Sequence, residues 1–187
     1  MNKMSAEQYG GVAERAELLV GQPEVELALD RMAAEVTKRL AGTDPVVLAV
    51  MTGGIVVTGL LLPRLDFQLR LEYIHATRYR NTTRGGALEW RHRPTEAIRG
   101  QHVLVVDDIF DEGVTMEAIV DACREDGAAE VQSAVLVEKL RPRDCTYRPD
   151  VIGMEIPDRY VMGYGLDYKS YFRNAPGIYA AADEDCG

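Results

Sequence analysis

The chain has 187 residues, with 21 Lys and Arg against 30 Asp and Glu, so its formal net charge is −9. That charge repels nucleic acid and anionic membranes at long range, and neither is an expected partner. Because the sequence has no signal peptide, no apolar run near the roughly 18 residues of a membrane span and only three scattered cysteines, we expect a cytoplasmic protein with reduced thiols.

The first part of the chain predicts two helices and a strand. Residues 6–20 are predicted to form a helix that breaks before Pro23, and residues 24–41 repeat apolar side chains at helical spacing. After a loop at 42–45, the continuous apolar run 46–51 predicts a short buried strand that ends at a glycine turn.

The middle of the chain predicts a helix, a strand and then a polar segment. Residues 55–62 predict a helix that stops at a proline, and residues 69–75 alternate as a strand. The segment 77–98 is polar, rich in Arg and contains the only tryptophan, Trp90, so we expect a mobile hairpin or flap there.

A strand at 102–106, a helix at 113–124 and a strand at 131–138 complete the predicted pattern. Alternating strands and helices indicate an open, mainly parallel α/β sheet flanked by helices. Ligands of such sheets bind at the carboxyl ends of the strands. The sequence places three notable segments at such ends: Met51 to Gly54, Asp107 to Thr115, and Lys139.

The segment 103–115 carries the strongest chemical signal. Four apolar residues lead into Asp107 and Asp108, and two more acids, Gly113 and Thr115 follow at the start of a predicted helix. Unpaired N–H groups and the positive dipole end of a helix bind phosphate without any net positive charge. The same acids could equally cap a helix, so the residues alone leave a helix cap and a sugar-phosphate site both open.

This segment resembles the motif by which type I phosphoribosyltransferases bind phosphoribosyl pyrophosphate (PRPP): a hydrophobic strand, two acids, two variable residues and Asp-Thr-Gly-x-Thr. The resemblance implies that Asp107 and Asp108 contact the ribose hydroxyls. It further implies that the 5-phosphate is held by the loop residues Asp111, Glu112, Gly113, Val114 and Thr115. Glu112 stands where the family usually has Thr or Ser, so we expect its side chain to turn away from the phosphate.

Two other segments resemble the same family. Met51-Thr52-Gly53-Gly54 resembles the pyrophosphate loop, in which Thr52 replaces a basic residue beside Gly53. Arg78-Tyr79 sits where the family's flexible loop begins, and such a loop closes over the site and excludes water.

The C-terminal third resembles the hypoxanthine-guanine branch of the family, over residues 148–168. The resemblance implies that Lys139 donates to the purine O6, that Tyr160 stacks on the base and that the Val161 backbone binds its pyrimidine-ring edge. It also implies that Asp167 lies in the purine site and holds a Mg²⁺ ion.

The reaction implied by the resemblance transfers the 5-phosphoribosyl group from PRPP to N9 of hypoxanthine and/or guanine, which yields IMP or GMP and pyrophosphate. Arg173 would contact pyrophosphate, and Asp111 would act as general base with a pKa that the nearby phosphate raises. Lys139 has only donors, so it should accept a 6-oxopurine and reject adenine.

Two alternatives remain at this stage: a xanthine-guanine preference, and a non-catalytic regulator of the same fold that senses PRPP or nucleotide. We expect one domain over residues 1–187, with a core at 42–150, a hood made by the N-terminal segment and residues 151–187, and a flexible loop at 77–98. The resemblance also implies a homodimer or homotetramer.

Overall fold

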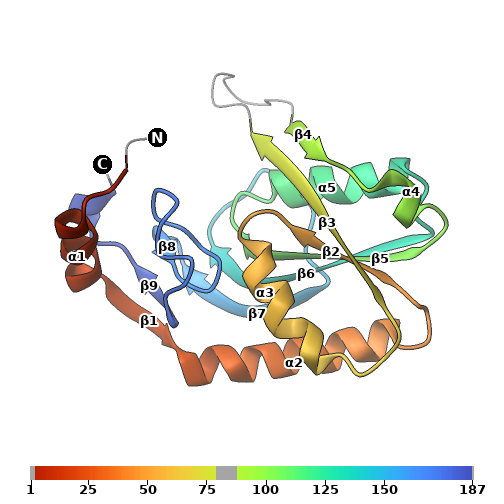
Figure 1. Ribbon diagram of the computed structural model, residues 1–187, viewed down its shortest axis with the longest axis horizontal. Helices are drawn as coiled ribbons and strands as arrows, with labels where there is room; N and C mark the ends of the chain where they lie inside the picture. The colour runs from red at the N-terminus through yellow and green to blue at the C-terminus, as the bar shows by residue number, and fades with distance from the viewer. Residues whose placement is uncertain (1–2, 79–87, 187) are drawn as a thin grey trace.

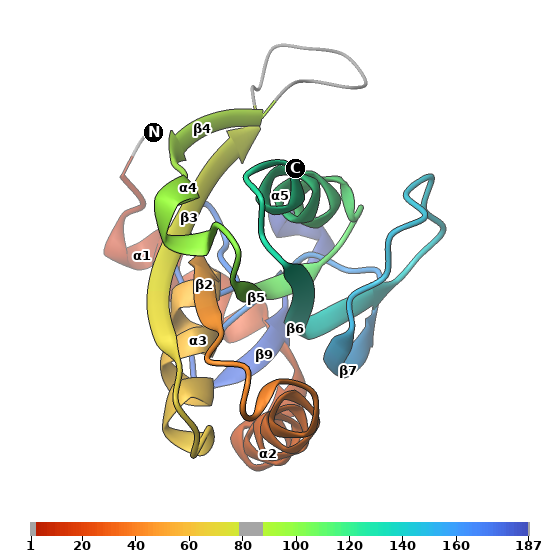
Figure 2. The ribbon, with the colours of Figure 1, turned by 90° about the vertical axis from the view of Figure 1, so that its right-hand side faces the viewer.

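The protein was analysed as a computed structural model that describes residues 3–78 and 88–186. A large sheet carries helices on both faces, and a small sheet lies beside one end of it (Figures 1 and 2). The helices are α1 Ala6–Arg15, α2 Gln22–Leu40, α3 Gly54–Leu61, α4 Thr95–Ile98 and α5 Val114–Glu125, with 3-10 turns η1 Leu62–Arg64 and η2 Asp183–Asp185. The strands are β1 Glu17–Gly21, β2 Val46–Val50, β3 Arg70–Arg78, β4 Leu88–His92, β5 His102–Phe110, β6 Glu130–Leu140, β7 Val151–Pro157, β8 Val161–Met162 and β9 Gly177–Ala180.

The large sheet has the strand order β4-β3-β2-β5-β6-β7. The pairs β2–β3, β2–β5, β5–β6 and β6–β7 are parallel, and only β4 pairs antiparallel, with β3. The predicted open, mainly parallel α/β sheet is therefore confirmed. The described helices are all too short or too polar to cross a membrane.

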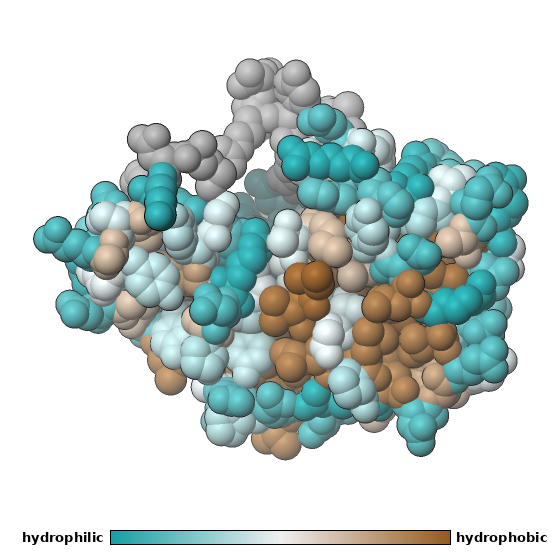
Figure 3. Space-filling model, viewed as in Figure 1, coloured by the Kyte–Doolittle hydropathy of each residue, from teal (hydrophilic) through white to brown (hydrophobic). Residues whose placement is uncertain are grey.

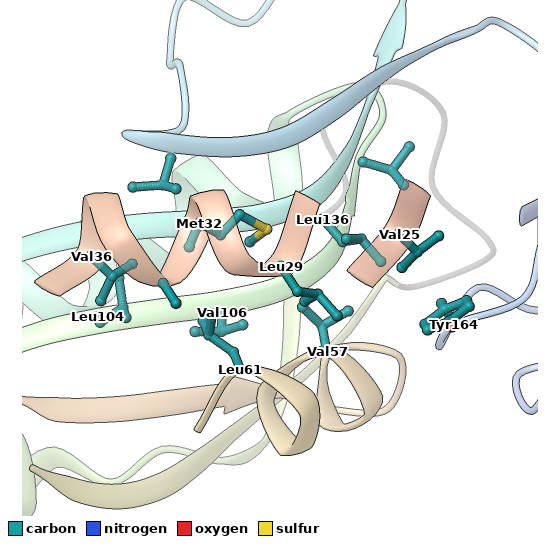
Figure 4. Close-up of a cluster of buried hydrophobic side chains, with 14 of the residues drawn as sticks. Val25, Leu29, Met32, Val36, Val57, Leu61, Leu104, Val106, Leu136 and Tyr164 are labelled. Atoms are coloured by element: carbon teal, nitrogen blue, oxygen red, sulfur yellow. The ribbon is translucent and has the colours of Figure 1, made fainter. Parts of the chain in front are cut away.

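The sheet buries both of its faces, which explains why its central strands read as continuous apolar runs. On one face α2 and α3 pack on the sheet, and Figure 4 shows Leu29, Met32 and Val36 pointing toward Leu104 and Val106. The residues in between, such as Val103 and Val105, face the opposite side, where they join the cluster that includes residues of α5. This period-2 division places α2 and α3 on one face and α5 on the other.

The first helix is shorter than predicted, because the residues that follow it belong to the small sheet. A capping box formed by Ser5 and Gln8 starts α1, but the helix ends at Arg15 instead of continuing through residue 20. The following residues form β1, which pairs antiparallel with β9, and Glu17 lies opposite Ala180. The apolar residues of this stretch are therefore partners of a strand near the other end of the chain, a contact that local spacing cannot reveal.

Three predicted boundaries also move. We expected residues 151–187 to belong to the hood, but β7 pairs in parallel with β6 through Ala134 and Val151, so the large sheet extends to Pro157. Likewise β5 and β6 run past their predicted ends. Asp107 and Asp108 thus lie within β5, and Lys139 lies within β6.

The segment predicted as a flap is a hairpin at its base. β3 and β4 pair antiparallel, with Ala76 opposite Trp90, and α4 then leads into β5. Arg78 is the last residue of β3. Tyr79, and with it the middle of the predicted flexible loop at 77–98, lies outside the described residues.

Candidate active site

A cleft of about 420 Å³ opens at the carboxyl ends of β2, β5 and β6, and β8 and the segment after it close the opposite side. A parallel sheet brings these strand ends to one edge, as the sequence predicted. The predicted site residues that line the cleft are Thr52, Gly53, Asp107, Asp108, Asp111, Thr115, Lys139, Tyr160, Val161, Asp167 and Arg173.

The turn from β5 into α5 contains the residues predicted to hold the 5-phosphate. Gly113 precedes the helix with φ +85°, a left-handed conformation that favours glycine, and a Cβ there would lie 2.8 Å from both Cys145 Sγ and the Phe110 ring. The 12-residue α5 therefore begins directly at the cleft, where its first N–H groups and Thr115 are placed to bind an anion.

Glu112 and Val114 are exposed in this turn, and neither side chain lines the cleft. The negative charge of Glu112 acts on Arg141, whose pKa is raised mainly by a hydrogen bond to Asp111 and further by Glu112. Glu112 thus lies outside the cleft lining, and the position of its carboxylate relative to a bound phosphate stays a prediction.

Asp107 and Asp108 form an acidic pair at the floor of the cleft, with Asp108 buried and Asp107 half-buried. The Asp108 N–H donates to the Asp107 carboxylate at 2.9 Å. Burial and the neighbouring Asp108 charge raise the pKa of Asp107 well above its usual range, and burial raises the pKa of Asp108 as well. Carboxyl groups at this position can accept hydrogen bonds from sugar hydroxyls.

The β2–α3 turn packs tightly against this pair. A Cβ at Gly53 would meet Asp108 Oδ2 at 1.8 Å, so only glycine allows the turn to lie so close to Asp108. The peptide between Met51 and Thr52 is cis. Thr52 is exposed at the cleft, and this turn contributes no cation to it.

Asp111 and Lys139 form an ion pair across the cleft, with Lys139 Nζ 3.0 Å from Asp111 Oδ2. Lys139 is buried, and Arg141 Nη1 lies 2.8 Å from the other Asp111 oxygen. We expected a raised pKa at Asp111, and burial acts in that direction. The hydrogen bonds from Lys139 and Arg141 outweigh burial, however, and hold the pKa of Asp111 below its usual value.

Arg173 links Asp167 and the Gly165 carbonyl, which follow β8, to Asp108 in β5. Its guanidinium lies 2.6 Å from Asp167 and 3.9 Å from Asp108, and it also donates to the Gly165 carbonyl. The Ser170 N–H donates to Asp167 at 2.7 Å and orients that carboxylate. The structure thus brings together residues that lie about 60 positions apart in the sequence.

Tyr160 and Val161 form the remaining wall. The Tyr160 ring is 43% exposed and packs edge-on against Tyr168, with ring centroids 5.5 Å apart. Val161 is buried in β8 opposite Ala180 of β9. An exposed aromatic face beside an ordered strand backbone can stack on a planar base and hydrogen-bond its edge.

Sequence reasoning missed Arg141 and Arg143, which hold Asp111 from the turn after β6. Arg143 is 4% exposed at its side chain, pairs with Glu138 at 2.7 Å and donates to the Asp111 carbonyl at 2.5 Å. It also donates to the Lys139 carbonyl. The available signal was the Arg-Pro-Arg sequence at 141–143, directly after the end of the strand that contains Lys139.

Comparison with known proteins identifies the family. Residues 17–169 match the phosphoribosyl transferase domain family, and the chain therefore belongs to it. Its relatives include the hypoxanthine-guanine phosphoribosyltransferase of Streptococcus pneumoniae, which is 32% identical over 168 residues that cover 89% of this chain and 93% of the relative. The hypoxanthine-guanine-xanthine phosphoribosyltransferase of Tritrichomonas foetus is 33% identical over 162 residues, 86% of this chain and 88% of the relative.

Solved structures lead to the same family. A hypoxanthine phosphoribosyltransferase of Trypanosoma cruzi in complex with the product IMP aligns with a TM-score of 0.83 at 26% identity, over 91% of this chain and 97% of that one. A hypoxanthine phosphoribosyltransferase of Staphylococcus aureus aligns with a TM-score of 0.86 over 97% of this chain and 98% of that one, and at 23% identity it bears on the fold alone.

Proposed function

We propose that this protein transfers the 5-phosphoribosyl group of PRPP to N9 of hypoxanthine and guanine, and releases IMP or GMP and pyrophosphate. The observation that carries the proposal is the single cleft in which a phosphate-binding helix start, the Asp107–Asp108 pair and the Lys139–Tyr160 wall meet. The first two features suit a sugar phosphate, and the third suits a 6-oxopurine. The names of the relatives support the same substrates.

The reaction breaks the bond between the anomeric carbon of PRPP and pyrophosphate and forms a bond from that carbon to purine N9. The turn at 111–115 would bind the 5-phosphate, and Asp107 and Asp108 would bind the ribose hydroxyls. These contacts fix the anomeric carbon between the base and the leaving group. Arg173 would stabilise the charge that develops on pyrophosphate.

Asp111 is the proposed general base, because it is the carboxylate beside both the phosphate turn and Lys139. It would hold the proton that the purine ring loses as the N9 bond forms. Lys139 would donate to the purine O6. The exocyclic amine of adenine presents donors there, so the ammonium favours 6-oxopurines.

Magnesium is the cofactor of this proposal. No group of three His, Cys, Asp or Glu side chains among the described residues could bind a metal by itself. Mg²⁺ that travels with substrate phosphates needs only one or two protein carboxylates, and Asp167, which lines the cleft, fits that requirement. When bound there, Mg²⁺ supplies positive charge to the leaving pyrophosphate.

A substrate panel tests the proposal: hypoxanthine, guanine, xanthine and adenine, each with PRPP and Mg²⁺. We expect turnover with the first two and none with adenine. Xanthine is included because the name of the Tritrichomonas foetus relative contains it. A marked preference for xanthine would favour the xanthine-guanine alternative. PRPP binding without turnover of any base would favour the regulator instead.

The phosphate turn makes a separate prediction about Glu112. Replacing Glu112 by Thr should lower the KM for PRPP modestly, because it removes a negative charge near the dianion and adds a hydroxyl donor. Replacing Thr115 by Ala should raise that KM, because it deletes a donor at the cleft. Steady-state kinetics at fixed Mg²⁺ measures both. A large fall in kcat/KM for Glu112→Thr would show that the carboxylate has a positive role.

We also propose a homodimer or homotetramer in the cytoplasm. Apolar side chains gather on the face shown in Figure 3. Ile55 of α3 and Leu71 of β3 are 48% and 53% exposed. Exposed apolar groups of this kind are typical of surfaces between subunits.

A further inference from the structure

Two cations, Lys139 and Arg141, pair with the carboxylate of Asp111. In the proposed function, Lys139 also binds the purine. Lys139 lies 3.0 Å from one carboxylate oxygen and Arg141 lies 2.8 Å from the other. Lys139 must also donate to the purine O6. An ammonium that turns toward the base weakens its bond to Asp111 at the moment when that carboxylate has to be ionised and in place.

Arg141 is placed to take over this contact. It follows Lys139 by two residues, so the extended backbone directs both side chains to the same side, and the intervening Leu140 is 57% exposed. Arg141 does not line the cleft, whereas Lys139 does. Arg141 can therefore stay paired with the Asp111 carboxylate from outside the cleft while Lys139 contacts the base.

The other charges around Asp111 explain how Arg141 is held. Asp158, which follows β7, lies 3.7 Å from Arg141 and 3.9 Å from Lys139, so it attracts both cations. Arg143 touches the backbone of Asp111 and not its carboxylate. Within the described residues, the ion pairs of the Asp111 carboxylate are those with Lys139 and Arg141.

We infer that Arg141 is a positioning residue that holds the Asp111 carboxylate in place while Lys139 binds the purine. This inference rests on the proposed function, since it assumes that Asp111 is the base and that Lys139 contacts O6. The phosphate of a bound substrate adds a dianion beside Asp111, which favours protonation of the carboxylate. Arg141 opposes that effect and keeps Asp111 able to accept a proton.

The test is the pH dependence of kcat, at saturating Mg²⁺-PRPP and hypoxanthine, for the wild type, Arg141→Met and Arg141→Lys. Without the cation, Asp111 is protonated at higher pH, so the acid limb of Arg141→Met should move to higher pH. The ratio of the wild-type kcat to the Arg141→Met kcat should be roughly tenfold larger on the acid limb than on the alkaline plateau. Arg141→Lys should restore much of the wild-type profile, because lysine keeps the charge.

Arg148→Met is the matched control. Arg148 lies in the same segment, is 60% exposed at its side chain and lies 3.7 Å from Glu138, away from Asp111. Its loss removes the same charge from the protein and should leave the acid limb where the wild type has it. Thermal melting of all variants separates a fall in stability from a change in the profile.

Three results would contradict the inference or the proposed function on which it rests. If Arg141→Met keeps the wild-type acid limb, or raises only the KM for hypoxanthine, then Arg141 does not position the base and the inference is wrong. If Asp111→Asn keeps its kcat, the proposed function of Asp111 fails first. An NMR titration of the ¹³C-labelled Asp111 carboxyl, with and without IMP, gives a readout independent of turnover, and equal titration in the wild type and Arg141→Met would overturn the inference.

Discussion

Replacing Asp111 by Asn should lower kcat by roughly 10²–10⁴-fold, the usual weight of general base catalysis, while the KM for PRPP changes little. The amide keeps the shape of the side chain but cannot accept the purine proton. In the proposed mechanism the backbone from 111 to 115 would hold PRPP, and the substitution should leave that backbone intact. The large effect should therefore appear in kcat alone.

Steady-state kinetics with PRPP varied at saturating hypoxanthine measures the effect. The substitution also takes a negative charge from Lys139 and Arg141, although Asp158 remains near both. A thermal melt is the control for this loss. A kcat near that of the wild type in a folded Asp111→Asn protein would mean that Asp111 only caps the turn, and the proposed mechanism would be wrong.

Replacing Lys139 by Met should lower kcat/KM for hypoxanthine by about 100-fold, the effect of losing one hydrogen bond to a charged group in a buried site. Methionine keeps the length and most of the packing of this buried side chain. Because adenine makes no favourable contact with the ammonium, its kcat/KM should change little or rise. The ratio between the two bases should therefore collapse.

The measurement is kcat/KM for hypoxanthine, guanine and adenine with the same enzyme preparation. Arg148→Met serves again as the charge control, because Arg148 is exposed and does not line the cleft. Equal falls in kcat/KM for hypoxanthine and adenine would show that Lys139 supports the site without distinguishing the two bases. Another group would then have to account for base selection.

Local sequence patterns determined much of the fold and the phosphate turn of this protein. The continuous apolar run at 46–51 and the strand at 102–106 predicted buried parallel strands, because a strand covered on both faces needs apolar residues at every position. The turn from Asp107 to Thr115 is contiguous in the chain. Its acids, glycine and helix start could therefore be recognised together before any contact between distant segments was known.

Only the tertiary structure decided which distant segments meet. Glu17 pairs with Ala180, and this pairing converts the end of a predicted helix into β1. Arg173 reaches both Asp108 and Asp167, and Arg141 reaches Asp111 from the turn after β6. Together with Lys139, Arg141 holds the pKa of Asp111 below its usual value despite burial. Periodicity and capping report the conformation of neighbouring residues, whereas such pairings depend on how strands far apart in sequence are brought to one edge of the sheet.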